Sequence, residues 1–227
     1  MPQPPELHVS DDPAAEVALL LAGQAARGGS IVLTGGSTPG KAYERAAKEQ
    51  PDWSKVELWW GDERCVPPDD ERSNYRLARE TLLDRLQEEP HTIHRIRGEA
   101  SPAEAAAELD SALAGAQLDF LLLGMGPDGH MASLFPGSPQ LEVTDRRATH
   151  GPPGLEPWVD RITFTVPTIQ SAKRIVFLIA GESKAEAAAR AFTGEISPDT
   201  PSSLARLAPV AVEVFLDPAA AARIRTS

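Results

Sequence analysis

The chain has 227 residues, one cysteine and a formal net charge of −11 at pH 7. This length is sufficient to bury a core without metal or disulfide support. The acidic balance argues against nucleic acid and anionic membranes as partners. The sequence has no apolar run long enough to span a bilayer, its first residues lack the features of a signal peptide, and Cys65 has no internal partner. These features predict a cytoplasmic protein in which Cys65 is a small buried side chain.

Short apolar segments alternate with longer helical segments along the chain. The expected strands are 30–34, 56–60, 118–123, 161–166, 174–179 and 212–216, and the expected helices are 13–27, 39–49, 73–87, 102–115, 184–192 and 218–225. Strands that are apolar on both faces suit a sheet covered on both sides. We therefore predict a single α/β domain over residues 1–227, with a doubly wound, mostly parallel sheet and helices on both faces. The proline-rich segment 136–160 is expected to form a long structured excursion.

The first loop of interest, residues 35–41, follows strand 30–34. It nearly matches the phosphate loop of nucleotide-binding proteins, but Ala42 stands where a magnesium-binding hydroxyl is needed and Pro39 removes an amide donor. We predict instead that Ser37 or Thr38 caps the next helix and that the loop amides and hydroxyls bind one phosphate group. A tight turn with a good helix cap is the alternative.

The second loop, Gly61-Asp62-Glu63-Arg64, follows strand 56–60. Ligands bind at the carboxyl ends of the strands in sheets of this kind. The two acids and the arginine could supply an acid or base, and a cation for an oxyanion or a carboxylate. A solvated charged loop with an internal ion pair is the alternative.

The third loop contains Gly124, Gly126 and Gly129 in the spacing G-x-G-x-x-G. A dinucleotide-binding turn requires a long helix after the third glycine. The prolines and glycine within 136–139 prevent one, so we do not predict a dinucleotide site.

His130 follows the third loop directly. Its unperturbed pKa of about 6.5 suits proton transfer at neutral pH. A nearby carboxylate, Asp62 or Asp128, could fix its tautomer. A structural or surface role is the alternative, and it is the interpretation we adopt for the other four histidines, His8, His91, His94 and His150.

Two later cations are candidate anion ligands. Lys184 is expected at the start of a helix capped by Ser183, where the helix dipole disfavours a positive charge unless an anion is shared. Arg161 begins a strand. An ordinary surface charge is the alternative for each. The sequence has no motif for a serine nucleophile or a metal site, so we predict neither metal nor cofactor.

Taken together, the loops resemble those of the 6-phosphogluconolactonase family. The matching segments are LTGGSTPG (33–40), WWGDERCVPPDDERSNYRLARETLL (59–83), LLLGMGPDGHMASLFPG (121–137), RITFTV (161–166) and FLIAGESKAEA (177–187). The resemblance implies a single-domain α/β enzyme. Its expected activity is the hydrolysis of 6-phospho-D-glucono-1,5-lactone to 6-phosphogluconate, the second step of the oxidative pentose phosphate pathway. The wider superfamily includes glucosamine-6-phosphate deaminases, which are similar in two of the loops.

The resemblance also implies roles for individual residues. His130 is the expected base, Asp62 its orienting or polarising partner, and Arg64 the arginine of the DER motif. The 6-phosphate is expected on Ser37, Thr38, Arg161 and Lys184, and further substrate contacts on Gly35, Gly36, Arg64, Asp128 and Gly129. Met131 and the segment 156–160 depart from the family pattern.

Two other functions remain open. One is a glucosamine-6-phosphate deaminase or isomerase with the same phosphate site. The other is a non-catalytic protein that binds sugar phosphates. For the lactonase, the expected partner is a phosphorylated sugar lactone, and the protein is expected to be a monomer.

Overall fold

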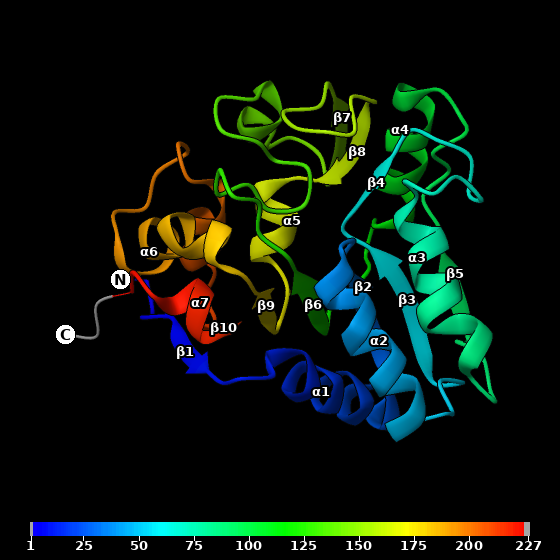
Figure 1. The fold of residues 1–227 in the computed structure, drawn as a ribbon. Helices are drawn as coiled ribbons and strands as arrows, with labels where there is room; N and C mark the ends of the chain where they lie inside the picture. The colour runs from blue at the N-terminus through cyan, green and yellow to red at the C-terminus, as the bar shows by residue number, and fades with distance from the viewer. Residues whose placement is uncertain (1, 225–227) are drawn as a thin grey trace.

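The computed structural model describes residues 2–224. Seven parallel strands form a large sheet in the order β1-β10-β9-β6-β2-β3-β5. Figure 1 shows this sheet with its helices. The strands are β1 (Glu6–Val9), β2 (Gly29–Leu33), β3 (Val56–Trp60), β5 (Thr92–His94), β6 (Phe120–Leu123), β9 (Ile175–Ile179) and β10 (Val212–Leu216). Every residue of β6 and β9 is buried, so both faces of the sheet are covered. The predicted α/β architecture is confirmed.

The direction of winding reverses beside β2. From β2 the chain adds β3 and β5 on one side, and it then returns to place β6, β9 and β10 on the other side. Such a reversal leaves a crevice at the carboxyl ends of the two strands that flank it. Here those strands are β2 and β6, which carry the first and third predicted loops.

A second, three-stranded antiparallel sheet lies at the carboxyl end of β3. Its order is β4 (Asp62–Arg64), β8 (Arg161–Phe164) and β7 (Ala148–Gly151). Segment 161–166 was expected among the parallel strands, and this expectation is wrong. The strand ends at Phe164 because α5 (Val166–Gln170) begins with a proline in its first turn.

Each predicted helix is found in its predicted order, with changes at its ends, and α5 is an additional helix that the sequence did not predict. The helices are α1 (Pro13–Arg27), α2 (Ser37–Glu49), α3 (Asn74–Thr81), α4 (Pro102–Ala112), α5, α6 (Ala185–Thr193) and α7 (Pro218–Ala221), with short 3₁₀ helices η1 (Leu83–Arg85), η2 (Pro139–Glu142), η3 (Glu182–Lys184) and η4 (Pro201–Leu207). The predicted helix 73–87 breaks after Thr81 into η1. Helix 218–225 ends at Ala221, and the prediction for residue 225 lies outside the described residues. Among the described residues, no helix combines the length and hydrophobicity needed to cross a bilayer.

Two predicted helix caps are wrong. Helix α2 begins at Ser37, and Gly36, with φ +110°, occupies the cap position without a side-chain bond. The glycine allows a backbone turn that starts the helix two residues earlier than predicted. Ser183 caps no helix, because residues 182–184 form η3 and Lys184 immediately precedes α6.

Candidate active site

A pocket of about 220 Å³ lies where the loops after β2, β6 and β9 meet. Its lining comprises Gly35, Gly36, Ser37, Thr38, Pro39, Gly124, Met125, Leu178, Ile179, Ala180 and Lys184. The start of α2 therefore shares one pocket with the Lys184 ammonium. Helix-start amides and a cation together form a site suited to a phosphate group.

The surroundings of Lys184 have two opposite effects on its pKa. Burial lowers the pKa of its ammonium group, and the negative charge of Asp128 raises it, with a net shift downward. A bound dianion would favour the charged form of the lysine further. Gly124 and Met125, from the loop that carries His130, also line the pocket, so the pocket adjoins this loop.

His130 is held by Asp128. Its Nδ1 lies 2.7 Å from Asp128 Oδ1, and its backbone N–H donates to the same oxygen at 3.2 Å. This contact favours the tautomer with the proton on Nδ1, which leaves the lone pair of Nε2 free to accept a proton. The ring also packs against Phe135, with centroids 4.6 Å apart. The residues alone left Asp62 and Asp128 both open as the partner of His130, and the family resemblance implied Asp62; the contact in the structure is with Asp128 instead.

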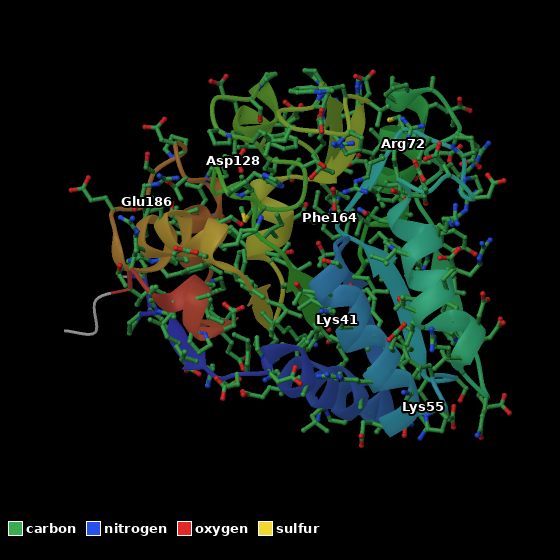
Figure 2. All side chains as sticks on the ribbon, viewed as in Figure 1. Lys41, Lys55, Arg72, Asp128, Phe164 and Glu186 are labelled. Atoms are coloured by element: carbon green, nitrogen blue, oxygen red, sulfur yellow. The ribbon has the colours of Figure 1, made fainter. Side chains whose placement is uncertain are left out.

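Asp128 remains a carboxylate in this contact. Burial raises its pKa, but the hydrogen bonds and charge of His130 lower it, and the net shift is downward. Figure 2 labels Asp128 on the loop after β6, at the opposite end of the molecule from Lys55, which precedes β3. The acid is therefore at the carboxyl end of the sheet, where ligands bind.

Two glycines allow the histidine loop to fold this tightly. A Cβ on Gly126 would lie 2.0 Å from His130 Nδ1. Gly129 has φ +91°, and a Cβ there would lie 2.8 Å from Thr200 Cγ2. The glycine spacing thus serves the Asp128–His130 contact, in agreement with the prediction that it is not a dinucleotide motif.

The small sheet presents a second group of site residues. Asp62 lies opposite Thr163, and Arg64 lies opposite Arg161. Residues directly opposite in an antiparallel pair point to the same face, so these four side chains share one face. The two guanidinium groups repel each other, and Asp62 offsets part of this repulsion by attracting Arg161.

Arg161 is almost fully buried, with 2% of its surface exposed. Its Nη2 donates to the carbonyl oxygens of Leu155 at 3.2 Å and Pro157 at 2.8 Å. Its Nη1 has no hydrogen-bond partner within residues 2–224. Burial and the charge of Arg64 lower the pKa of Arg161. Arg161 comes from the small sheet and is not among the residues that line the Ser37–Lys184 pocket.

Asp62 and Glu63 have structural partners. Asp62 accepts from Ser133 Oγ at 2.6 Å and from Asn74 Nδ2 at 3.3 Å. Glu63 is 2% exposed and anchors the start of α3, where it accepts from the backbone N–H groups of Asn74 at 2.7 Å and Tyr75 at 2.8 Å. The alternative interpretation, a solvated charged loop with an internal ion pair to Arg64, does not hold for the described residues, because Asp62 and Glu63 are buried and neither pairs with the Arg64 guanidinium. Arg64 instead donates from Nη1 to the carbonyl oxygen of Arg72.

Comparison with known proteins places the chain in a family. Residues 9–214 match the model of the family described as glucosamine-6-phosphate isomerases/6-phosphogluconolactonase. The chain belongs to this family. A 6-phosphogluconolactonase from Synechocystis sp. is 40% identical over 180 residues, which cover 75% of this chain and 74% of the relative.

Solved structures of this family share the whole fold. A 6-phosphogluconolactonase from Trypanosoma cruzi aligns with a TM-score of 0.85 and 26% identity, covering 100% of this chain and 99% of the other. A monomeric glucosamine-6-phosphate deaminase aligns with a TM-score of 0.85 and 21% identity, covering 97% of this chain and all of the other. At that identity the second match shows the fold alone.

The sequence analysis did not identify two residues that contact the site, Asn74 and Ser133. Asn74 and Ser133 lie in the matching segments 59–83 and 121–137, but neither residue type signals a role by itself. Their contacts with Asp62 become visible only in the structure. Cys65 was expected to be buried but is only partly buried against the core, and burial raises the pKa of its thiol to about 11.

Proposed function

We propose that this protein hydrolyses 6-phospho-D-glucono-1,5-lactone to 6-phosphogluconate, as the second step of the oxidative pentose phosphate pathway. The main support is the position of His130, whose Nδ1 is held by Asp128 at 2.7 Å beside the pocket lined by Ser37, Thr38 and Lys184. A base next to an anion pocket suits a substrate with a phosphate at one end and a reactive carbonyl at the other. The names of the relatives support the same substrate.

In the proposed reaction, His130 Nε2 takes a proton from water as the water oxygen attacks the lactone carbonyl carbon. General-base assistance of this kind contributes about 10²–10⁴-fold. The tetrahedral intermediate carries a negative oxygen, for which the amides of Gly35 and Gly36 or the guanidinium of Arg64 are candidate donors. The carbon–ring oxygen bond then breaks, and the proton on Nε2 passes to the departing ring oxygen. The products are a hydroxyl and a carboxylic acid, which ionises.

The phosphate supplies positioning. Ser37, Thr38 and Lys184 are proposed to bind it, with Gly129 nearby in the histidine loop. Binding energy from a remote, non-reacting group can hold the carbonyl within reach of the base. Arg161 is proposed as a substrate ligand from the small sheet, since its Nη1 donor is unused within residues 2–224. The reaction needs no metal or cofactor, because the lactone ester already has a reactive carbonyl.

The proposal includes a cytoplasmic monomer with no nucleic acid or membrane partner. Its direct test is an assay of 6-phosphogluconolactone hydrolysis in the presence of a chelator, with ammonia release from glucosamine 6-phosphate measured in parallel. Hydrolysis without ammonia release supports the lactonase. Ammonia release without hydrolysis would establish the deaminase instead. If neither activity is detected, the protein would be a non-catalytic protein that binds sugar phosphates.

A further inference from the structure

Asp62 joins two of the loops that form the site. It is 6% exposed, and its Oδ2 accepts a hydrogen bond from Ser133 Oγ at 2.6 Å. Asn74 Nδ2 donates to the backbone oxygen of Asp62 at 3.0 Å and to its Oδ1 at 3.3 Å. Ser133 and Asn74 are themselves 1% and 2% exposed. A buried carboxylate with buried partners is a rigid connection, because breaking one bond leaves an unpaired polar group.

On one side, this connection holds the histidine loop. Ser133 follows His130 by three residues, and its backbone N–H donates to Thr163 Oγ1 at 3.2 Å. Between them, Ala132 has φ +49°, which a non-glycine residue adopts only where its surroundings impose it. The two hydrogen bonds of Ser133 fix the chain directly after this residue. They therefore fix the turn that carries His130.

On the other side, the connection reaches the phosphate pocket. A Cβ on Gly35 would lie 2.0 Å from Asn74 Oδ1, so the amide of Asn74 packs directly against the first residue of the pocket. Asn74 Oδ1 has no hydrogen-bond partner in the described part of the chain. The two bonds that Asn74 donates to Asp62 therefore set the orientation of its amide, and the amide sets how close Gly35 can come.

We propose that Ser133 and Asn74 are positioning residues that act through Asp62. Ser133 holds the loop of the base, and Asn74 holds the loop of the phosphate pocket. Together they fix the spacing between His130 and the bound phosphate, which places the carbonyl for attack. The kinetic part of this inference rests on the proposed function.

The test compares Ser133→Ala and Asn74→Ala with the wild-type protein. Steady-state kinetics on the lactone, titration of the His130 imidazole by NMR and calorimetric binding of inorganic phosphate are measured for each. Ser133→Ala is expected to lower kcat about 10–100-fold with little change in KM, and to alter the His130 titration, because small misplacements of a catalytic group are costly. Asn74→Ala is expected to weaken phosphate binding and raise KM about tenfold, with a smaller effect on kcat.

The matched control is Ser30→Ala. Ser30 is also a buried serine, with Oγ donating to the Gln117 carbonyl at 2.6 Å, but it lies at the amino end of β2. The control should leave the kinetic constants, the His130 titration and phosphate binding unchanged. If Ser133→Ala does not fold, Thr163→Val removes the acceptor of the Ser133 N–H and should give the same selective loss of kcat.

The proposal is wrong if the variants lose thermal stability but keep the wild-type kcat and KM, the wild-type titration of the His130 imidazole and the wild-type phosphate affinity. The imidazole and phosphate measurements do not require lactone turnover. A wild-type protein without lactonase activity would therefore refute the proposed function alone, while these two measurements would still decide the role of Ser133 and Asn74.

Discussion

Asp128 Oδ1 lies 2.7 Å from His130 Nδ1, and the two residues are separated in the chain only by Gly129. The acid that orients the ring is therefore part of the same turn as the ring itself. Positive φ at Gly129 brings the two side chains together. The tautomer of His130 depends on this local contact. Asp62 does not contact the ring in this way, and instead accepts a hydrogen bond from Ser133.

The first prediction concerns Asp128→Asn. Asparagine keeps the shape of the side chain but can present an N–H to Nδ1, which would favour the tautomer with the proton on Nε2. Because Nε2 could then no longer accept a proton, kcat is expected to fall about 10²–10⁴-fold. Steady-state kinetics with NMR assignment of the imidazole tautomer would check this. An unchanged kcat would show that Asp128 does not orient the base.

The second prediction concerns the pH dependence of stability. The pKa of Asp128 is lower in the folded protein than its ordinary value. A lowered folded pKa stabilises the fold above the unfolded pKa of about 3.9, and this contribution disappears as the pH falls through the folded pKa. The difference in free energy of unfolding between the wild type and Asp128→Asn should thus be greatest above about pH 4 and shrink in stronger acid. Urea denaturation at several pH values measures it, and a difference that grows in acid contradicts the assignment.

The third prediction separates binding from chemistry at Lys184. Lys184→Ala removes the cation from the phosphate pocket but leaves His130 in place. We expect KM to rise by about 10–100-fold, from the loss of a charge-assisted bond, with a smaller change in kcat. Lys41→Ala is the control, since Lys41 lies one turn into α2 and does not line the pocket. A loss confined to kcat would instead place Lys184 in the chemical step.

The fourth prediction tests the space that Gly126 provides. In Gly126→Ala the added methyl would meet the imidazole of His130 at 2.0 Å, so the ring or the turn must move. We expect a loss of about 1–3 kcal/mol of stability and a marked fall in kcat. Gly23→Ala is the control, because a Cβ there meets only the end of the Arg27 side chain at 3.7 Å. Wild-type kcat in Gly126→Ala would show that the ring tolerates displacement.

The sequence predicted the strands β2, β3, β6, β9 and β10 of the large sheet because they are largely apolar, but it missed the edge strands β1 (ELHV) and β5 (TIH), which are short and of mixed polarity. The segments at β3 and β10 match the predicted ranges, and α1 matches its predicted bounds. It missed β4 and β7, whose sequences DER and ATHG lack an apolar pattern and become strands only by pairing with β8. The carboxyl-end loops were therefore found, while the small sheet that carries Asp62 and Arg161 was not.

The sequence predicted which loops form the site more readily than it predicted which side chains contact one another there. The loops of Ser37 and Lys184 converge because the strands before them, β2 and β9, are parallel, are separated only by β6 and end at the same edge of the sheet. Which carboxylate meets His130 depends on turn geometry, and the sequence left Asp62 and Asp128 both open. Arg161 lies opposite Arg64 because β8 pairs antiparallel with β4, a pairing that no motif spacing encodes.

The most direct test of the proposed activity is 6-phosphogluconolactone hydrolysis by the wild-type protein and by His130→Ala, measured with a chelator present and corrected for spontaneous hydrolysis. Phosphate binding by calorimetry verifies that the variant keeps its pocket. We predict rapid hydrolysis by the wild type and a loss of at least about 10²-fold in kcat for His130→Ala, with phosphate affinity retained. Hydrolysis by His130→Ala at the wild-type rate would contradict the account.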